Sequence, residues 1–441
     1  MTQLSKKDLV FVSFMLFSMF FGAGNLIFPP FLGQSAGDHV WLSLAGFIVS
    51  AVGIPILGVA AIAKTGSFQT LSSRVHPSFA FIFPIIIYLS IGPGLAIPRA
   101  GSLAFEMGVG PFLSEQWAAN PISLFLYTLI FFGLVHWLSM SPTKLVDRFG
   151  KFLTPFLLLL IAGIFITSLI SPIGEYGAAT GKYETQPVFQ GFLDGYLTMD
   201  ALAALVFGIV VANTLRAKGV DNTQKLTSYI IYAGLGAGFL LTVIYLILGF
   251  LGASASSAPA ENGAQILTFV MNQLFGQSGT LILGAVFTLA CLCVSIGLVT
   301  SCSQFFTTAF PKLPYSLWVK ILCITSMIIA NLGLTQILKV SVPILGAIYP
   351  IAIVLIILGL FDQISARVPA VYLSTVVFVA AFSITDTLNS TFAWNIGADF
   401  LKSMPLYAEG VGWLVPAMVG LVVGLAVSLL FTSRSVPKQS L

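Results

Sequence analysis

The chain has 441 residues, of which 57% are hydrophobic and only 8% are charged. Soluble domains carry roughly 25% charged residues, so a lipid bilayer must be the solvent for most of this surface, as the mean hydropathy of +1.01 also indicates. The composition excludes a cytosolic enzyme, a nucleic-acid-binding protein and a disordered chain, and the net charge of +4 is too small to indicate a polyanionic partner.

Twelve apolar stretches are long enough to cross a bilayer, which takes about 20 residues as a helix. The sequence therefore predicts an all-α polytopic membrane protein with one domain over residues 1–441. The shorter amphipathic segment 261–276 predicts an extra-membrane or re-entrant helix. The expected spans are 8–33, 40–63, 78–104, 121–141, 152–171, 196–215, 228–252, 279–309, 315–333, 341–361, 368–388 and 412–432.

The basic residues predict the orientation of these spans. With the N-terminus in the cytoplasm, 15 of the 19 Lys and Arg residues fall on the inner side. Cytoplasmic loops are enriched in Lys and Arg, and a wrong span count would scramble this segregation. We therefore expect both termini to be cytoplasmic. The four basic residues left over are Arg99, Lys182, Lys339 and Lys402.

The first span carries a cluster that is typical of a broken helix. Gly22 and Gly24 each lower helix stability by about 1 kcal/mol relative to Ala, and Asn25 can cap a second half-helix or ligate a cation. Pro29 and Pro30 suit the first turn of a new helix. Irregular backbone at membrane depth marks a transport site, so we expect an unwound segment here; close packing of small residues is the alternative.

The sixth span repeats part of this pattern, with Phe207 and Gly208 near its middle and Asn213 downstream. This echo predicts a second break at 207–209, as a five-plus-five inverted repeat would give. Alternatively, Asn213 simply begins the exit toward Arg216. The ends of broken helices offer N–H groups to a carboxylate and carbonyls to Na⁺ or an ammonium group, so a zwitterionic amino acid fits them.

Further polar residues interrupt the apolar spans. Arg99 is costly within a span and should be paired, either with Glu106 two helical turns along or with Asp200 at the outer start of the sixth span. We expect these three residues to form a gate or a structural ion pair. The Tyr88 hydroxyl could reach a bound carboxylate, or Tyr88 could be part of the core.

No arrangement of residues indicates an enzyme, an organic cofactor or a transition-metal site, because nucleophile–base groups, phosphate-binding loops and clustered carboxylates are missing from the spans. Without an ATP-binding motif, the energy for transport must come from an ion gradient. Four cysteines lie in apolar runs without metal-ligand spacing and should be buried: Cys291, Cys293, Cys302 and Cys323.

The stretch FFGAGNLIFPP at 20–30 resembles the first span of bacterial branched-chain amino acid carriers of the BrnQ type (the LIVCS family). Further similar stretches are 91–99, 205–210 and 341–350. The resemblance covers essentially the whole chain. It implies Na⁺-coupled symport of leucine, isoleucine and valine across the bacterial cytoplasmic (inner) membrane. It also implies a LeuT-like fold, with repeats at 8–171 and 196–361 and two additional helices at 368–432.

The resemblance also implies which residues bind the substrate. The backbone of Phe20 would contact the ammonium group, and the N–H groups of Ala23 and Gly24 would hold the carboxylate. Independently of the resemblance, Tyr88, Phe207 and Gly208 are further candidates for this pocket, and Phe207 could select a branched side chain by apolar contact.

For the coupling cation, the resemblance makes Asn25 a Na⁺ ligand and turns the carbonyls of Ser18 and Phe21 toward a second site on span eight. Its residues there are Ala290, Cys293, Val294 and Ser295.

Span eight departs from the family pattern Ala-Cys-Leu-Thr-Thr, because this chain has ACLCVS at 290–295. A thiol is a poor ligand for a hard cation, so Ser295 or backbone carbonyls would have to serve. Proton coupling therefore remains an alternative. A carrier for another small solute is a second alternative. A channel or a membrane sensor is an alternative from a different class of membrane protein. A small-molecule substrate and the bilayer are the expected partners, and no obligate protein partner is evident.

Overall fold

The computed structural model describes residues 4–140, 145–220, 222–362 and 368–432, and every regular element in them is helical. Short 3₁₀ turns lie at Gly37–His39, Gly110–Phe112 and Gly181–Tyr183, and π-helical turns at Val49–Gly53 and Ser90–Gly94. The α-helices are α1 (Lys6–Phe20), α2 (Ala23–Ala36), α3 (Val40–Ile48), α4 (Ile54–Thr65), α5 (Phe68–Ser73), α6 (Pro77–Leu89), α7 (Ala96–Gly108), α8 (Glu115–Ala118), α9 (Pro121–Ser139), α10 (Leu145–Ile170), α11 (Pro187–Tyr196), α12 (Asp200–Ala217), α13 (Thr223–Ser254), α14 (Gly263–Ala309), α15 (Tyr315–Ala330), α16 (Leu334–Leu360), α18 (Pro369–Phe392), α19 (Ala398–Lys402) and α20 (Leu414–Thr432).

Eight helical stretches in the described part of the chain are long and apolar enough to cross a membrane. Two of them join several elements, at Ala23–Thr65 and Pro77–Phe112. Shorter apolar helices lie at Pro155–Ile170, Tyr315–Ala330 and Leu414–Leu430. The helical, multi-span character predicted from composition is confirmed, whereas the count of twelve spans and the inverted repeat remain predictions.

The break predicted in the first span is confirmed, because α1 ends at Phe20 and α2 begins at Ala23. Between them Gly22 is extended, with φ −128° and ψ −165°. The expectation that tandem prolines start the second half is wrong, since Pro29 and Pro30 lie in the interior of α2. Helices packed around a buried segment can support such prolines, and α2 packs closely on α13 and α14.

The break predicted at 207–209 is also wrong. Residues 200–217 form one continuous helix, α12, and a Cβ atom on Gly208 would lie only 2.7 Å from Cβ of Ile62 on α4. Gly208 is therefore a packing glycine that lets two helices approach. The interruption lies at residues 197–199, between α11 and α12, where Met199 adopts a left-handed conformation with φ 68°.

The helix predicted at 261–276 corresponds to the beginning of α14, which bends sharply at Gly276. There φ is +60° and ψ is −155°, a conformation that only glycine adopts without strain. Asn262 caps α14 by accepting hydrogen bonds from the N–H groups of Ala264 and Gln265. The bend separates this first part from the long apolar remainder of α14.

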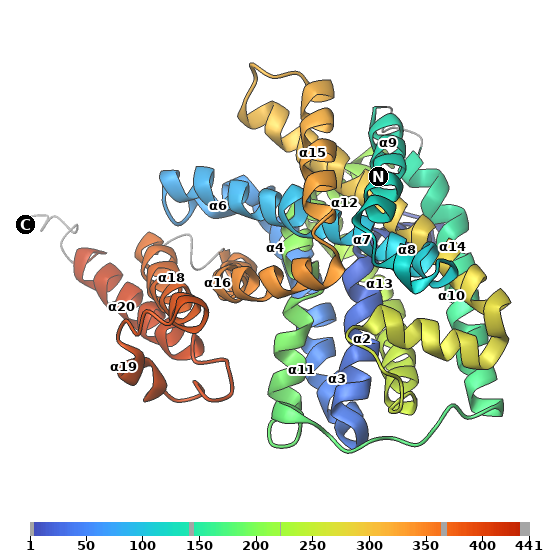
Figure 1. Ribbon diagram of the computed structural model, residues 1–441. Coiled ribbons are helices and arrows are strands. Elements are labelled where there is room, and N and C mark those ends of the chain that lie inside the picture. The colour runs from blue at the N-terminus through green and yellow to red at the C-terminus, as the bar shows by residue number, and fades with distance from the viewer. Residues whose placement is uncertain (1–3, 141–144, 221, 363–367, 433–441) are drawn as a thin grey trace, which may run out of the picture.

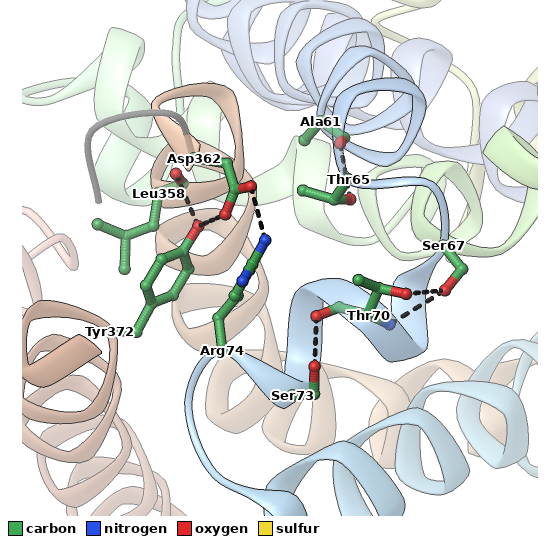
Figure 2. A network of polar contacts seen from close by, with 9 residues as sticks. All are labelled: Ala61, Thr65, Ser67, Thr70, Ser73, Arg74, Leu358, Asp362 and Tyr372. Carbon is green, nitrogen blue, oxygen red and sulfur yellow. Dashed lines mark hydrogen bonds and ion pairs between the residues drawn. The ribbon is translucent and has the colours of Figure 1, made fainter. Parts of the chain in front are cut away.

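The C-terminal helices α18, α19 and α20 lie to one side of the other helices, with α16 beside them (Figure 1). A polar network joins this region to the segment after α5, as Figure 2 shows. In it, Arg74 forms an ion pair with Asp362 at 3.1 Å, and the Tyr372 hydroxyl donates to Asp362 at 3.0 Å. The network links α5, α16 and α18.

Candidate functional site

The two helix breaks lie against each other in the buried part of the molecule. A Cβ atom on Gly24, the second residue of α2, would lie 3.0 Å from Cα of Thr198 in the break between α11 and α12. A side chain at this position would therefore push the two breaks apart. The end of α1, the start of α2, the end of α11 and the start of α12 consequently meet in one place.

The first turn of α2 is organised by Asn25. Its Oδ1 atom accepts a hydrogen bond of 3.0 Å from the N–H of Gly22. This is the reciprocal half of a capping box, in which the third helical residue holds the residue before the helix. The N–H groups of Ala23 and Gly24 have no partner within a helix, and the positive end of the α2 dipole lies here. Asn25 thus caps the second half-helix, as the sequence predicted.

Asp200 is the first residue of α12 and of the candidate span Asp200–Ala217, so it lies directly at the break. Only 2% of its surface is exposed. Its Oδ2 atom accepts hydrogen bonds from Asn25 Nδ2 at 2.6 Å and from the Tyr245 hydroxyl at 3.1 Å, and Asn25 also donates to Tyr245. A carboxylate at a helix N-terminus interacts favourably with the helix dipole.

Arg99 donates its hydrogen bonds to backbone carbonyls, and it interacts with the predicted partner Asp200 only electrostatically, without a direct ion pair. Its Nη1 atom donates to the carbonyl of Leu197 at 2.7 Å, and Nη2 donates to that of Thr198 at 3.5 Å. Glu106 instead accepts hydrogen bonds from Asn262 and Gln265, which start α14. The expected ion pair is therefore absent from the described residues, whose two ion pairs are Arg74–Asp362 and Lys218–Asp8.

Two of the aromatic residues predicted for the pocket meet at the break. The rings of Phe20 and Phe207 lie 6.2 Å apart between centroids, and both are buried. Tyr88 packs elsewhere, since its ring stacks on Phe305 of α14 at 3.8 Å and its carbonyl accepts from the Cys302 thiol. Tyr88 thus packs closely against α14, through its ring and its backbone carbonyl.

The residues predicted for a second cation site are partly brought together. A Cβ atom on Gly22 would lie 3.3 Å from Cγ1 of Val294, so α14 packs against the first break. The Ser295 hydroxyl is fully buried and has no hydrogen-bond partner in the described structure. The hydroxyl of Ser18 is used within α1, where it donates to the carbonyl of Met15 at 2.8 Å. Ala290 is buried and Cys293 half-buried, also on α14.

Three residues of this arrangement were not predicted. Leu197 and Thr198 form the second break and bind Arg99, and Tyr245 binds Asp200. Thr198 and Asp200 are two polar residues close together in an apolar stretch, which is a signal that could have located the break. Tyr245 carries no such signal, because it lies in the middle of an ordinary apolar span.

Sequence comparison relates the chain to one family over almost its full length. The family described as "Branched-chain amino acid transport protein" matches residues 5–430. The chain is 46% identical to the branched-chain amino acid permease BraB of Bacillus subtilis, with 96% of each chain covered. It is 37% identical to the permease BrnQ of Escherichia coli K12, again over 96% of each.

Solved structures share the fold of this chain over nearly its full length. Mhp1, a nucleobase-cation-symport-1 family transporter, matches with a TM-score of 0.62 at 12% identity, over 98% of this chain and 94% of Mhp1. MhsT in complex with L-phenylalanine matches with a TM-score of 0.54 at 15% identity, over 95% of this chain and 98% of MhsT. At these identities the likeness shows the fold alone.

Proposed function

Because the chain belongs to the branched-chain amino acid transport protein family, we propose that it is a secondary-active symporter that imports leucine, isoleucine and valine by using a sodium gradient. The observation that carries this proposal is the meeting of two helix breaks beside Gly24 and Thr198. Such paired breaks put backbone donors and acceptors at the middle of a membrane, around which a transporter alternates its access. The protein is a carrier and not an enzyme.

In this proposal the substrate lies between the broken helices. The carbonyl of Phe20 at the end of α1 takes the ammonium group, and the N–H groups of Ala23 and Gly24 take the carboxylate. Phe20 and Phe207 supply the apolar surface for a branched side chain. Tyr88 and Gly208 support the substrate site indirectly: Tyr88 packs on α14, and Gly208 packs on α4.

The coupling cation is proposed to bind on the other side of the first break. Carbonyls of Ser18 and Phe21 face α14. There Ala290, Cys293, Val294 and Ser295 complete the site through backbone carbonyls and the Ser295 hydroxyl, because a thiol is a poor ligand for a hard cation. The unpartnered Ser295 hydroxyl supports this assignment. Asn25 lies between this site and the substrate.

Proton coupling is the second candidate, and Asp200 favours it. A buried carboxylate that is hydrogen-bonded by Asn25 and Tyr245 is a group that could carry a proton across the membrane. Arg99, Glu106 and Asp200 remain proposed as gating or structural residues. Arg99 and Asp200 act at the breaks, whereas Glu106 acts at the start of α14.

For the whole chain we propose twelve spans in the bacterial cytoplasmic membrane with both termini in the cytoplasm. The interruptions at 21–22 and 197–199 fall in the first and sixth spans, which supports two inverted repeats at 8–171 and 196–361 followed by helices at 368–432. The segregation of basic residues supports the orientation.

Uptake into proteoliposomes tests the proposal. Leucine uptake should saturate, should be competed by isoleucine and should show counterflow, which a channel does not give. Replacing Na⁺ by choline at fixed pH should abolish it. Uptake that is unchanged in choline would overturn sodium coupling and leave protons as the driving ion. The substrate class would be overturned if, in a thermal-shift panel, only other solutes raised the melting temperature of the protein.

A further inference from the structure

Arg99 is a buried cation that has no carboxylate partner among the described residues. It is 2% exposed and takes part in neither of the two described ion pairs. A charge inside a membrane protein is costly unless it is paired, and such residues usually mark a functional site. The position of Arg99 between the two breaks therefore needs an explanation.

The guanidinium group is held in place but is not saturated. Nη1 and Nη2 donate to the carbonyls of Leu197 and Thr198, and the guanidinium carbon lies 5.5 Å from the centre of the Phe28 ring. A guanidinium has five N–H donors, and the described hydrogen bonds use two of them. The Nε atom is buried without any partner. Arg99 is thus oriented by the end of α11 and keeps donors available.

The same guanidinium lies directly on the first turn of α2. Its Nη2 atom would be 2.7 Å from a Cβ atom on Gly24. The N-terminus of α2 also carries positive partial charge on unpaired N–H groups. Two positive groups are therefore packed side by side, and an anion that contacted both would be stabilised by both.

Asp200 interacts with Arg99 electrostatically, but only at a distance beyond that of an ion pair. Its carboxylate is engaged by Asn25 and Tyr245, and no ion pair joins it to Arg99 in the described structure. An amino acid carboxylate would fit, because a guanidinium and a carboxylate form parallel hydrogen bonds from two nitrogens to two oxygens.

We propose that Arg99 binds the substrate carboxylate directly, as a fixed cation built into the junction of the two helix breaks. This inference rests on the proposed function, since it requires an amino acid as substrate. It makes a free carboxylate a condition for tight binding.

The test compares L-leucine with L-leucinamide, which keeps the ammonium group and the side chain but lacks the carboxylate. Equilibrium binding to the purified full-length protein is measured for the wild type, Arg99→Gln and Arg99→Lys. Arg216→Gln is the matched control, because Arg216 is exposed near the end of α12. The wild type and the control should both prefer leucine.

Arg99→Gln should weaken leucine binding by about ten- to a hundredfold and leave leucinamide binding nearly unchanged, because charge-assisted hydrogen bonds are lost. Equal weakening of both ligands, or an unchanged preference, would overturn the inference and leave Arg99 as a structural cap of α11. If Arg99→Gln does not fold, Arg99→Lys decides by the same ratio: selective loss of leucine supports the inference, and equal loss overturns it. A wild type that binds no leucine would instead overturn the proposed function, and the inference with it.

Discussion

The buried carboxyl group of Asp200 lies beside the helix breaks, and its neighbours fix its position. Oδ2 accepts hydrogen bonds from Asn25 and Tyr245 at 2.6 and 3.1 Å. Hydrogen bonds to a charged group contribute about 1.5–3 kcal/mol each, so the carboxylate also orders the side chains that contact it. In the proposed transport cycle the ionised form of Asp200 would attract a coupling cation near the substrate.

Asp200→Asn keeps the size of the side chain and removes its charge. We expect the Na⁺ concentration for half-maximal leucine uptake to rise by at least about tenfold, since a charge-assisted contact corresponds to roughly that factor. Uptake of radiolabelled leucine into proteoliposomes over a series of Na⁺ concentrations measures the change. If protons drive transport, the same variant should instead lose the pH dependence of uptake.

The matched control for this variant is Asp399→Asn, since Asp399 is exposed on α19. It should leave both the Na⁺ dependence and the pH dependence of uptake unchanged. An Asp200→Asn protein with wild-type Na⁺ and pH profiles would show that Asp200 has only a structural role.

At the scale of elements, α12 and α4 pack through Gly208, which the sequence alone could not distinguish from a break. A methyl group at this position would overlap Ile62, at 2.7 Å from its Cβ and Cγ2 atoms. Overpacking of a well-packed contact costs about 1–3 kcal/mol. We expect Gly208→Ala to lower the melting temperature of the purified protein.

Gly133→Ala is the control for this prediction, because Gly133 is a helical glycine on α9 and a Cβ atom added to it would have no neighbouring atom within 4 Å. There the higher helix propensity of Ala should leave stability unchanged or raise it. A Gly208→Ala protein that is as stable as Gly133→Ala would contradict the packing role.

The two breaks show which parts of the fold a sequence can predict. The first carries its own signals, Gly22 and Gly24, so its position follows from local conformational preferences. The second consists of residues 197–199, without Gly or Pro, and is held by Arg99 from a distant helix. Tertiary contacts override local propensity there. For the same reason, the sequence gives no indication that Asn25 and Asp200 are partners. They are 175 positions apart, yet Asn25 donates a hydrogen bond to Asp200.

At the scale of the whole molecule, the polar network in Figure 2 joins the C-terminal helices to the segment after α5. Lys64 at the end of α4 donates to the carbonyl of Leu360 at 2.9 Å, next to the ion pair of Arg74 and Asp362. The Tyr372 hydroxyl on α18 donates to Asp362 and to the carbonyl of Leu358. The network thus connects α16 and the C-terminal helices to the segment between the second and third predicted spans. In the proposed orientation, this segment faces the cytoplasm.

A double-mutant cycle on Arg74→Gln and Asp362→Asn measures how strongly this network couples. The Arg74 side chain is 40% exposed and that of Asp362 only 15%, so we expect a coupling of about 0.2–1 kcal/mol, as for surface ion pairs. Asp362→Asn should cost more alone than Arg74→Gln, because Asp362 also accepts from Tyr372. Unfolding free energies in detergent, at low and high salt, give the coupling and its screening.

The same cycle on Lys218 and Asp8, a second partly exposed pair, is the comparison. Additive effects of the two substitutions at low salt would mean that the ion pair does not hold these helices together, and that the apolar packing of α16 on α18 joins the C-terminal helices to the rest by itself.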